Sequence, residues 1–140
     1  MMIGQFESLV PGQQLDALHK EAVSKVQLVK YAGASGDFNP LHTDDAFAQS
    51  IGLSGVIAHG MLIMGFLGEY VMKLAGSQAE VQSFNMRFGA MTRPGDSISC
   101  HGVIEELFEQ DGRSCARLSL SAEKAEGVAV GTGKAVLRFF

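Results

Sequence analysis

Cysteine, proline and positive charge are all scarce in this sequence of 140 residues. The two cysteines, Cys100 and Cys115, form no CxxC pair and accompany no histidine cluster at zinc spacing, so we expect two reduced, semi-buried thiols and no bound metal. The net charge is −4 and no basic run occurs, which argues against nucleic acid as a partner. With 46% hydrophobic and 19% charged residues, the chain is too apolar to be disordered and predicts one globular domain over residues 1–140.

Signals for export and for a membrane span are also missing. The first residues, MMIGQFESLVPG, lack a basic segment followed by an apolar run, so no signal peptide is predicted. The longest apolar stretch, Gly55 to Gly76, is interrupted by His59, Glu69 and Lys73, which favours a buried helix over one that crosses a bilayer. We therefore expect a cytoplasmic protein with no membrane partner.

The N-terminal half predicts short elements followed by one long helix. A strand is expected over Ala17–Val23, then a helix over 25–32 that begins at Ser24, ends at Gly33 and turns Val26, Val29 and Leu28 inward. Asp44 or Asp45 is expected to cap a short helix that ends at Ser50.

The long helix is predicted from Val56 to Ala75, with Gly76 as its C-terminal glycine. Almost every face of it is apolar, so we expect it to be buried all round. Each internal glycine (Gly60, Gly65, Gly68) costs a helix about 1 kcal/mol relative to alanine, which predicts close approach of another backbone.

After Gly76 the hydrophobic period changes to two, which predicts strands over 81–88, 97–107, 117–122 and 128–139. Turns are expected at Pro94-Gly95 and at Asp111-Gly112. Short helices, one long buried helix and a run of antiparallel strands make an α+β pattern. We predict the hot-dog fold, in which an antiparallel sheet wraps around one long buried helix.

The segment YAGASGDFNPLH carries the candidate chemistry. Asp37 and His42 stand on either side of Asn39-Pro40, and the proline prevents a continuous helix there. A turn of this kind can bring a carboxylate and an imidazole to one point, where they can move a proton in both directions near pH 7. Turn chemistry alone could also explain Asp37, and His42 could be a structural histidine.

The second candidate element is His59-Gly60 at the start of the long helix. The first turn of a helix has free N–H groups and the positive end of the dipole, which suit a developing oxyanion. Gly60 has no side chain to block an incoming carbonyl group. His59 could equally be a buried histidine bonded to a backbone carbonyl.

These motifs resemble a known family. The run from Ala34 to His42 followed by Ala46-Phe47-Ala48, the helix start VIAHGM and the Arg93-Pro94-Gly95-Asp96 turn are similar to MaoC-like hydratases and dehydratases over roughly residues 5 to 139. The resemblance implies reversible hydration of a trans-2-enoyl thioester to the (R)-3-hydroxyacyl thioester, on CoA or acyl-carrier protein, without a cofactor. It implies that Asp37 and His42 activate a water and that the Gly60 N–H receives the thioester oxygen.

One position departs from the family. Some (R)-specific hydratases carry a serine six residues after the helix-start histidine, where this chain has Gly65. The departure leans towards the branch of small dehydratase subunits.

Further contacts to the substrate are expected from Asn39 and His59. Arg87 and Arg93, with Lys73 a weaker candidate, are expected to meet the phosphates of the thioester carrier, although plain surface charge explains them equally well.

Two other functions fit the same fold. A hot-dog thioesterase needs an acid near the start of the long helix, and here the first is Glu69. A non-catalytic subunit would have no use for Asp37 and His42. A single hot-dog sheet leaves one edge strand unpaired, so we expect a homodimer, with a heterodimer or a higher oligomer as alternatives.

Overall fold

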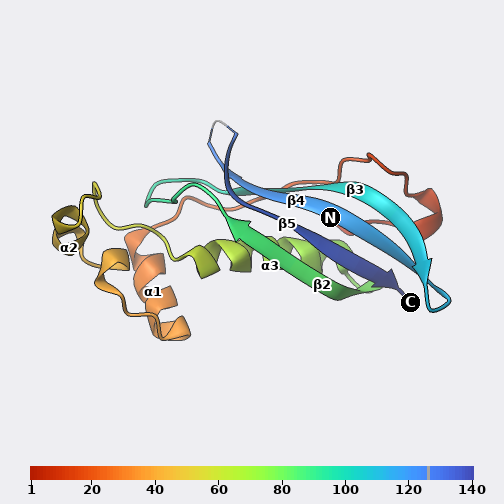
Figure 1. Cartoon of the computed structure of the whole chain (residues 1–140), viewed down its shortest axis with the longest axis horizontal. Coiled ribbons are helices and arrows are strands. Elements are labelled where there is room, and N and C mark those ends of the chain that lie inside the picture. The colour runs from red at the N-terminus through yellow and green to blue at the C-terminus, as the bar shows by residue number, and fades with distance from the viewer. Residues whose placement is uncertain (126) are drawn as a thin grey trace.

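The computed structural model describes residues 1–125 and 127–140 and has one curled antiparallel sheet around one long helix. Figure 1 shows α3 lying along one face of the sheet, with α1 and α2 gathered beyond its N-terminal end. The sheet order is β1-β3-β4-β5-β2. The elements are the 3-10 helices η1 (Phe6–Ser8) and η2 (Pro40–His42), the helices α1 (Lys25–Ser35), α2 (Asp45–Ser50) and α3 (Gly60–Ala75), and the strands β1 (Leu18–His19), β2 (Ala79–Phe88), β3 (Ser99–Gln110), β4 (Arg113–Lys124) and β5 (Val128–Phe139).

The two faces of the sheet differ as strand alternation requires. Ile98, Cys100 and Ile104 are buried, and they join one core with α3 and the inward residues of β4 and β5. Burial raises the pKa of the Cys100 thiol to about 12, so this side chain stays a thiol at neutral pH. The predicted α+β arrangement of a sheet wrapped around one helix is therefore what the chain forms.

Helix α3 begins later than predicted. Residues 56–58 are not helical because their N–H groups bond to neighbouring segments: Val56 to the Asp45 carboxylate (2.9 Å), Ile57 to the Leu41 carbonyl (3.2 Å) and Ala58 to the Thr92 carbonyl (2.8 Å). The β-branched side chains of Val56 and Ile57 also favour extended backbone. The helix ends as predicted, because the N–H of Gly76 bonds to the Met72 carbonyl.

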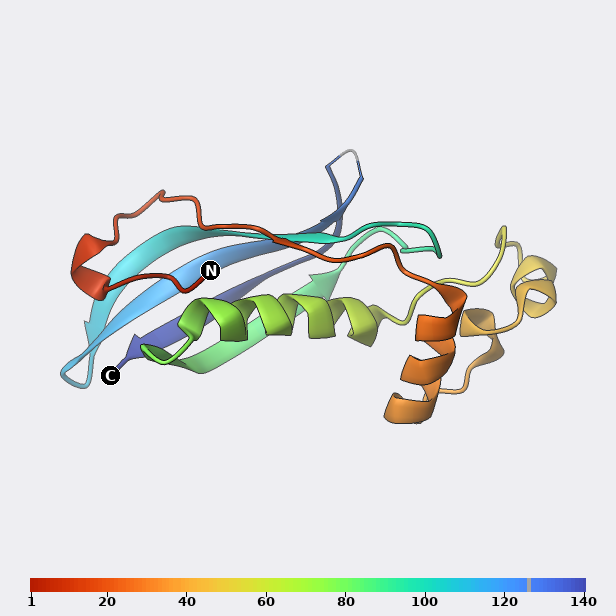
Figure 2. The same ribbon diagram turned by 180° about the vertical axis from the view of Figure 1, so that it is seen from behind.

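The prediction that α3 is buried all round is wrong for the single chain. Met61 is 54% exposed and Met72 63% exposed, and they lie on one face of the helix with Gly65 and Gly68. We call this face the apolar stripe of α3. Seen from behind, α3 lies uncovered on the side away from the sheet (Figure 2).

Among residues 1–125 and 127–140, no other backbone makes the expected close approach to the internal glycines of α3. Aromatic side chains from β2 cover two of them: a Cβ at Gly60 would stand 2.9 Å from the Phe88 ring, and one at Gly68 would stand 3.5 Å from Phe84. At Gly65, no atom of the described residues outside the helix lies within 4 Å of where a Cβ would stand.

Helix α1 departs from its prediction in length and in the face that it buries. Ser24 caps it as predicted, accepting a hydrogen bond from the Gln27 N–H (3.1 Å). The helix then continues past Gly33 to Ser35, because Gly36 is the residue that adopts the left-handed conformation (φ 75°). Leu28 and Ala32 are buried, whereas Val26 and Val29 are exposed.

The predicted strand over Ala17–Val23 is also shorter, because only Leu18 and His19 pair regularly with β3. The other residues of the predicted strand make isolated backbone hydrogen bonds instead, for example from the Lys20 N–H to the Ile98 carbonyl (2.8 Å). The predicted short helix is confirmed, with Asp44 and not Asp45 as its cap, and so is the turn at Asp111-Gly112, where both residues have positive φ.

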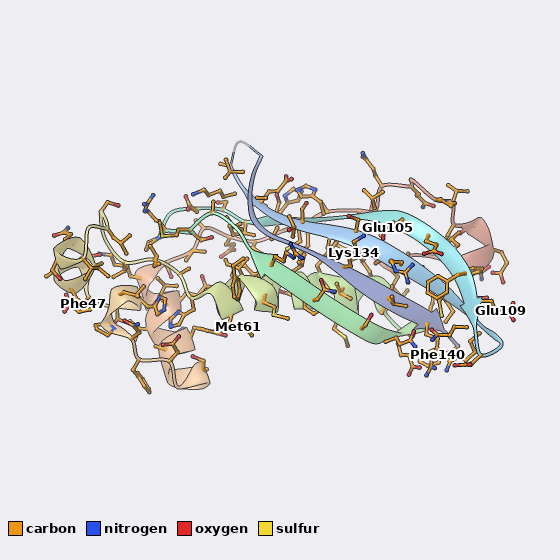
Figure 3. All side chains as sticks on the ribbon, viewed as in Figure 1. Phe47, Met61, Glu105, Glu109, Lys134 and Phe140 are labelled. Atoms are coloured by element: carbon orange, nitrogen blue, oxygen red, sulfur yellow. The ribbon has the colours of Figure 1, made fainter. Side chains whose placement is uncertain are left out.

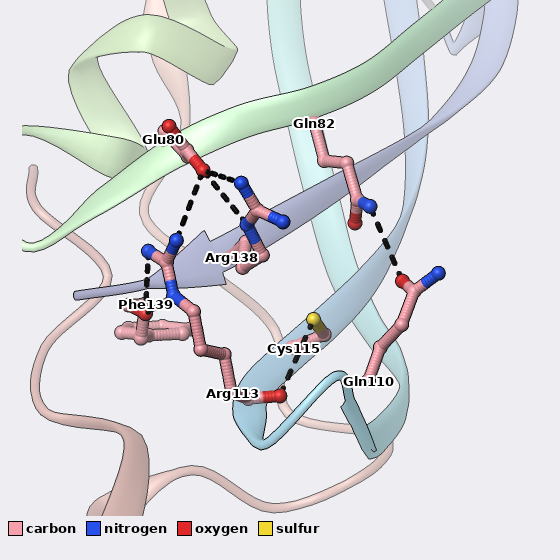
Figure 4. Close-up of polar contacts among 7 residues, drawn as sticks. All are labelled: Glu80, Gln82, Gln110, Arg113, Cys115, Arg138 and Phe139. Carbon is pink, nitrogen blue, oxygen red and sulfur yellow. Dashed lines mark hydrogen bonds and ion pairs between the residues drawn. The ribbon is translucent and has the colours of Figure 1, made fainter.

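Ion pairs join β2, β4 and β5 at the end of the sheet that is far from α1 and α2. The Glu80 carboxylate accepts from Arg138 Nε (2.7 Å) and from Arg113 Nη1 (3.3 Å), and Arg113 also donates to the Phe139 carbonyl (Figure 4). The bond from Arg138 lowers the pKa of Glu80. Among residues 1–125 and 127–140, no helix is both long and apolar enough to cross a membrane.

The position of the C-terminal glycine of α1 gives a stability prediction. Gly33 lies inside the helix with open space around its Cα, so Gly33→Ala should stabilise the fold by about 0.5–1 kcal/mol. Gly36→Ala should destabilise it by about 1–2 kcal/mol, because alanine resists the left-handed conformation. Urea unfolding measures both changes, and the opposite order of stabilities would place the end of the helix at Gly33.

Candidate active site

Asp37 and His42 are brought together by two consecutive turns after α1. The Asp37 carboxylate accepts the Asn39 N–H (3.2 Å), and the Asn39 amide oxygen then accepts the Leu41 N–H (3.1 Å) as the cap of η2. Pro40 starts η2 because its fixed φ suits a first helical position. The chain thereby reverses, and His42 comes back towards Asp37.

The imidazole of His42 is oriented by a backbone carbonyl. Its Nδ1 lies 2.8 Å from the Ile57 oxygen, which can only accept, so the proton of the neutral ring is on Nδ1. Nε2 then carries a lone pair and faces the Asp37 carboxylate at 3.8 Å. His42 is buried, whereas the Asp37 side chain is half-exposed, so the pair opens to solvent on the Asp37 side.

His59 contacts both members of this pair. Its ring stacks on the His42 ring, with centroids 3.8 Å apart and planes 21° apart, and its Nε2 lies 3.2 Å from the Asp37 carbonyl oxygen. The Tyr31 ring from α1 packs against His59 in a T-shaped arrangement, with ring centroids 4.8 Å apart. His59 is 2% exposed, so it meets neighbours on every side.

Gly60 begins α3 next to His59, whose side chain does not cap this end of the helix. The N–H groups of the first turn lack partners inside a helix and carry the positive end of its dipole. The Phe88 ring from β2 lies beside Gly60, and Met61 is exposed next to it. The site therefore combines two proton acceptors, a helix N-terminus and an apolar rim.

Asp45 ties the segments that frame the site. Its carboxylate pairs with Lys25 of α1 and accepts the Val56 N–H at 2.9 Å. The hydrogen bond from Lys25 lowers the pKa of Asp45, so the carboxylate is charged at neutral pH. Gly55 fits beside it because a Cβ there would stand 3.0 Å from the Asp45 oxygen.

The cluster of Asp37, His42 and His59 has the composition of a metal site, with one candidate ligand atom from each lying within 4.8 Å of the others. Metal ligation needs the nitrogen lone pairs to converge on one point. These lone pairs lie in the ring planes, and two stacked rings direct them side by side. The arrangement therefore suits hydrogen bonding rather than metal binding.

The remaining predicted site residues, Asn39, Arg93 and Lys73, lie on three different segments. Asn39 caps η2 and is exposed within the same turn. Arg93 is exposed on the loop before β3, which is joined to the start of α3 by the Ala58 to Thr92 hydrogen bond. Lys73 forms an ion pair with Glu69 (3.0 Å).

Arg87 points to the other face of the sheet. Phe84 and Phe88 of β2 face α3, whereas Arg87 lines a hollow of about 510 Å³ on the outer face with His101, Thr132 and Lys134. Figure 3 shows Lys134 and Glu105 over the strands, and Met61 on α3 beyond the edge formed by β2. In the single chain, Arg87 is therefore separated from Asp37 and His42 by the sheet.

Three contributors to the site carry no signal of their own in the sequence. These are the Ile57 carbonyl, the Phe88 ring and the Tyr31 ring. Ile57 lies 15 residues after His42, Phe88 belongs to β2 and Tyr31 belongs to α1. A backbone carbonyl cannot be read as functional from residue type, and both aromatic residues look like ordinary core candidates.

The comparisons with known proteins agree on one family. The model of the MaoC like domain matches residues 6–124. The chain is 31% identical over 111 residues to the (R)-specific enoyl-CoA hydratase of Rhodospirillum rubrum, which covers 79% of this chain and 76% of that protein. It is 29% identical over 134 residues to the 3-hydroxybutyryl-CoA dehydratase of Methylorubrum extorquens, which covers 95% of this chain and 82% of that one.

Some relatives are much longer. The chain spans 4% of the fatty acid synthase beta subunit TOXC of Cochliobolus carbonum and 13% of the peroxisomal hydratase-dehydrogenase-epimerase of Neurospora crassa. Among solved structures, an (R)-hydratase from A. caviae involved in PHA biosynthesis superposes with a TM-score of 0.82 at 27% identity, over 96% of this chain and 99% of that one. The hot-dog fold is confirmed, and the chain belongs to the MaoC-like domain family that its motifs predicted.

Proposed function

We propose that the protein catalyses the reversible hydration of a trans-2-enoyl thioester to the (R)-3-hydroxyacyl thioester. One observation carries this proposal: His42 Nε2 and the Asp37 carboxylate stand 3.8 Å apart beside the uncapped start of α3. The names of the hydratase and dehydratase relatives support the same reaction.

Both members of the pair present lone pairs to the space between them. An ionised carboxylate only accepts hydrogen bonds, and His42 Nε2 accepts because its proton is on Nδ1. Two acceptors at this separation can both be reached by one water, which then donates one hydrogen to each. Its oxygen lone pairs are left facing outwards, towards a substrate.

The reaction follows from this placement. The water oxygen bonds to the β-carbon while the carbon–carbon π electrons move onto the thioester oxygen. The pair takes up the proton that the water loses, and a proton is delivered to the α-carbon as the enolate collapses. The Gly60 N–H at the helix start stabilises the negative oxygen, an effect typically worth about 3 kcal/mol for one preorganised donor.

A thioesterase is less well supported. The first acidic residue of α3, Glu69, forms ion pairs with Lys20 (2.7 Å) and Lys73 (3.0 Å), and the hydrogen bond from Lys20 lowers its pKa. It lies more than two helical turns from Gly60 and is engaged away from the pair. The assembled Asp37 and His42 also weigh against a purely structural subunit.

The apolar stripe of α3 and the free edge of β2 support a homodimer. In the described residues β2 pairs only with β5, so ten residues of one edge are open. Met61, Met72 and Phe88 are each more than half exposed along the same side. A second copy joined by a two-fold axis would cover this side and supply a wall for the acyl chain. The cytoplasmic location stays a prediction.

Substitution of the pair tests the reaction. Asp37→Asn keeps the acceptor for the Asn39 N–H but removes the charge, and His42→Ala removes the Nε2 lone pair. Each change should lower kcat for crotonyl-CoA by at least about 100-fold, because general acid–base catalysis contributes at least that much. The double variant should be little worse than the worse single variant, since both residues act on one water. The loss of enoyl absorbance measures hydration, and a thiol reagent measures release of CoA.

Asp111→Asn and His19→Ala are the matched controls, because both residues are exposed and lie outside the site. They should leave kcat within about twofold. A His42→Ala enzyme that keeps more than a tenth of the wild-type rate would sink the proposal, and release of CoA without hydration would identify a thioesterase.

The dimer is tested at the apolar stripe. Met72→Glu should shift the protein towards monomer in light scattering at micromolar concentration, because a charge would be buried against the second copy. Val128→Glu places the same charge on an exposed apolar residue (41% exposed) of β5 and should leave the dimer intact. A wild-type monomer with full activity would contradict the dimer.

We propose Arg93 rather than Arg87 as the phosphate contact, because its loop is joined to the start of α3 by the Ala58 to Thr92 hydrogen bond. Arg93→Ala should raise KM for crotonyl-CoA by about 3- to 10-fold at low salt, with less effect at high salt, because a charge-assisted bond to phosphate is screened. Arg87→Ala, which changes the outer face, is the matched comparison. Equal increases for both variants would restore Arg87 as a phosphate contact, and no change for Arg93→Ala would exclude Arg93.

A further inference from the structure

His59 occupies the N-cap position of α3 but does not cap the helix. N-cap residues are usually Ser, Thr, Asp or Asn, whose side chains accept an N–H of the first turn. The His59 side chain makes no such bond and turns back to the Asp37 carbonyl oxygen instead. The helix start is therefore left open, and the side chain at this position is used elsewhere.

The hydrogen bonds of His59 define its tautomer. The Asp37 carbonyl can only accept, so Nε2 of His59 carries the proton. Nδ1 is buried and has no hydrogen-bond partner among the described residues. A proton there would lack an acceptor, so the uncharged Nε2–H form is the one that fits this environment.

His42 has the opposite tautomer, with its proton on Nδ1. The two rings are stacked at 3.8 Å, so the uncharged His59 ring fixes the plane of His42 without adding a positive charge beside it. The Tyr31 ring also packs against His59, with ring centroids 4.8 Å apart. One side chain thus touches both members of the pair, the backbone of Asp37 and the face of His42.

We propose that His59 is a positioning residue, which holds the Asp37 carboxylate and the His42 Nε2 lone pair at the separation that one water can bridge. This inference rests on the proposed function of the pair. It replaces the expected contact between His59 and substrate with a supporting role, because a side chain that is 2% exposed and packed under His42 offers no free surface.

Two variants separate the contributions of the side chain. His59→Phe keeps a ring that can stack but cannot donate to the Asp37 carbonyl, and His59→Gln keeps a donor without the ring. His59→Phe should lower kcat for crotonyl-CoA by about 10- to 100-fold with KM within about twofold, because the reacting groups move and the binding surface does not. His59→Gln should recover part of the loss. His101→Phe, on the outer face of the sheet, is the matched control.

A double-mutant cycle distinguishes positioning from a general loss of structure. Because His59 acts through the pair, His59→Phe added to Asp37→Asn should cost less than about threefold further, whereas an independent structural effect would multiply. Full additivity, or a His59→Phe enzyme with wild-type kcat, would overturn the inference. If His59→Phe does not fold, the same cycle with His59→Gln distinguishes a positioning role from a general loss of structure.

Nitrogen-15 NMR of labelled histidine gives a readout that does not depend on activity. In the wild type His42 should show the Nδ1–H tautomer and His59 the Nε2–H tautomer, with assignments from the single variants. If both rings had the same tautomer, the positioning role of His59 would be contradicted even in an active enzyme. A wild-type protein that is inactive on crotonyl-CoA but shows the expected tautomers would count against the reaction and leave the geometric inference standing.

Discussion

The site depends on the backbone of one residue, Ile57, which bonds through both of its polar groups. Its N–H donates to the Leu41 carbonyl, and its carbonyl accepts from His42 Nδ1. These two bonds hold η2 against the extended segment that leads into α3, and the second one leaves the Nε2 lone pair of His42 facing Asp37. A single misplacement of this segment would therefore change the tautomer, the orientation of His42 and the start of the helix together.

The sequence predicted the elements that carry a local signal. Ser24, Asp44, Gly76 and Asp111-Gly112 mark caps and turns through their own backbone preferences, and the structure has caps and turns at these positions. The period of two predicted the strands and the hot-dog arrangement. The family motifs pointed to Asp37, His42 and Gly60. The structure brings Asp37 and His42 together and packs both against His59, the residue before Gly60.

Predictions that needed a distant neighbour were the ones that failed. Val26 and Leu28 are equally apolar, and only the packing of the whole chain decides that Leu28 is inside. The start of α3 was misplaced because the partners of Val56 to Ala58 come from three other segments. Residue type also could not show that Arg87 faces the outer side of the sheet.

The strand order has a consequence for how the chain acquires its structure during synthesis. β2 precedes β3 and β4 in the sequence, yet its neighbour in the sheet is β5, which is made last. While the ribosome is still extending the chain, α3 and the Phe84 and Phe88 side chains of β2 have no closed sheet to enter. Until β5 emerges, both edges of β2 are open to other nascent chains, so this interval is when the polypeptide is most exposed to misassembly and to capture by chaperones.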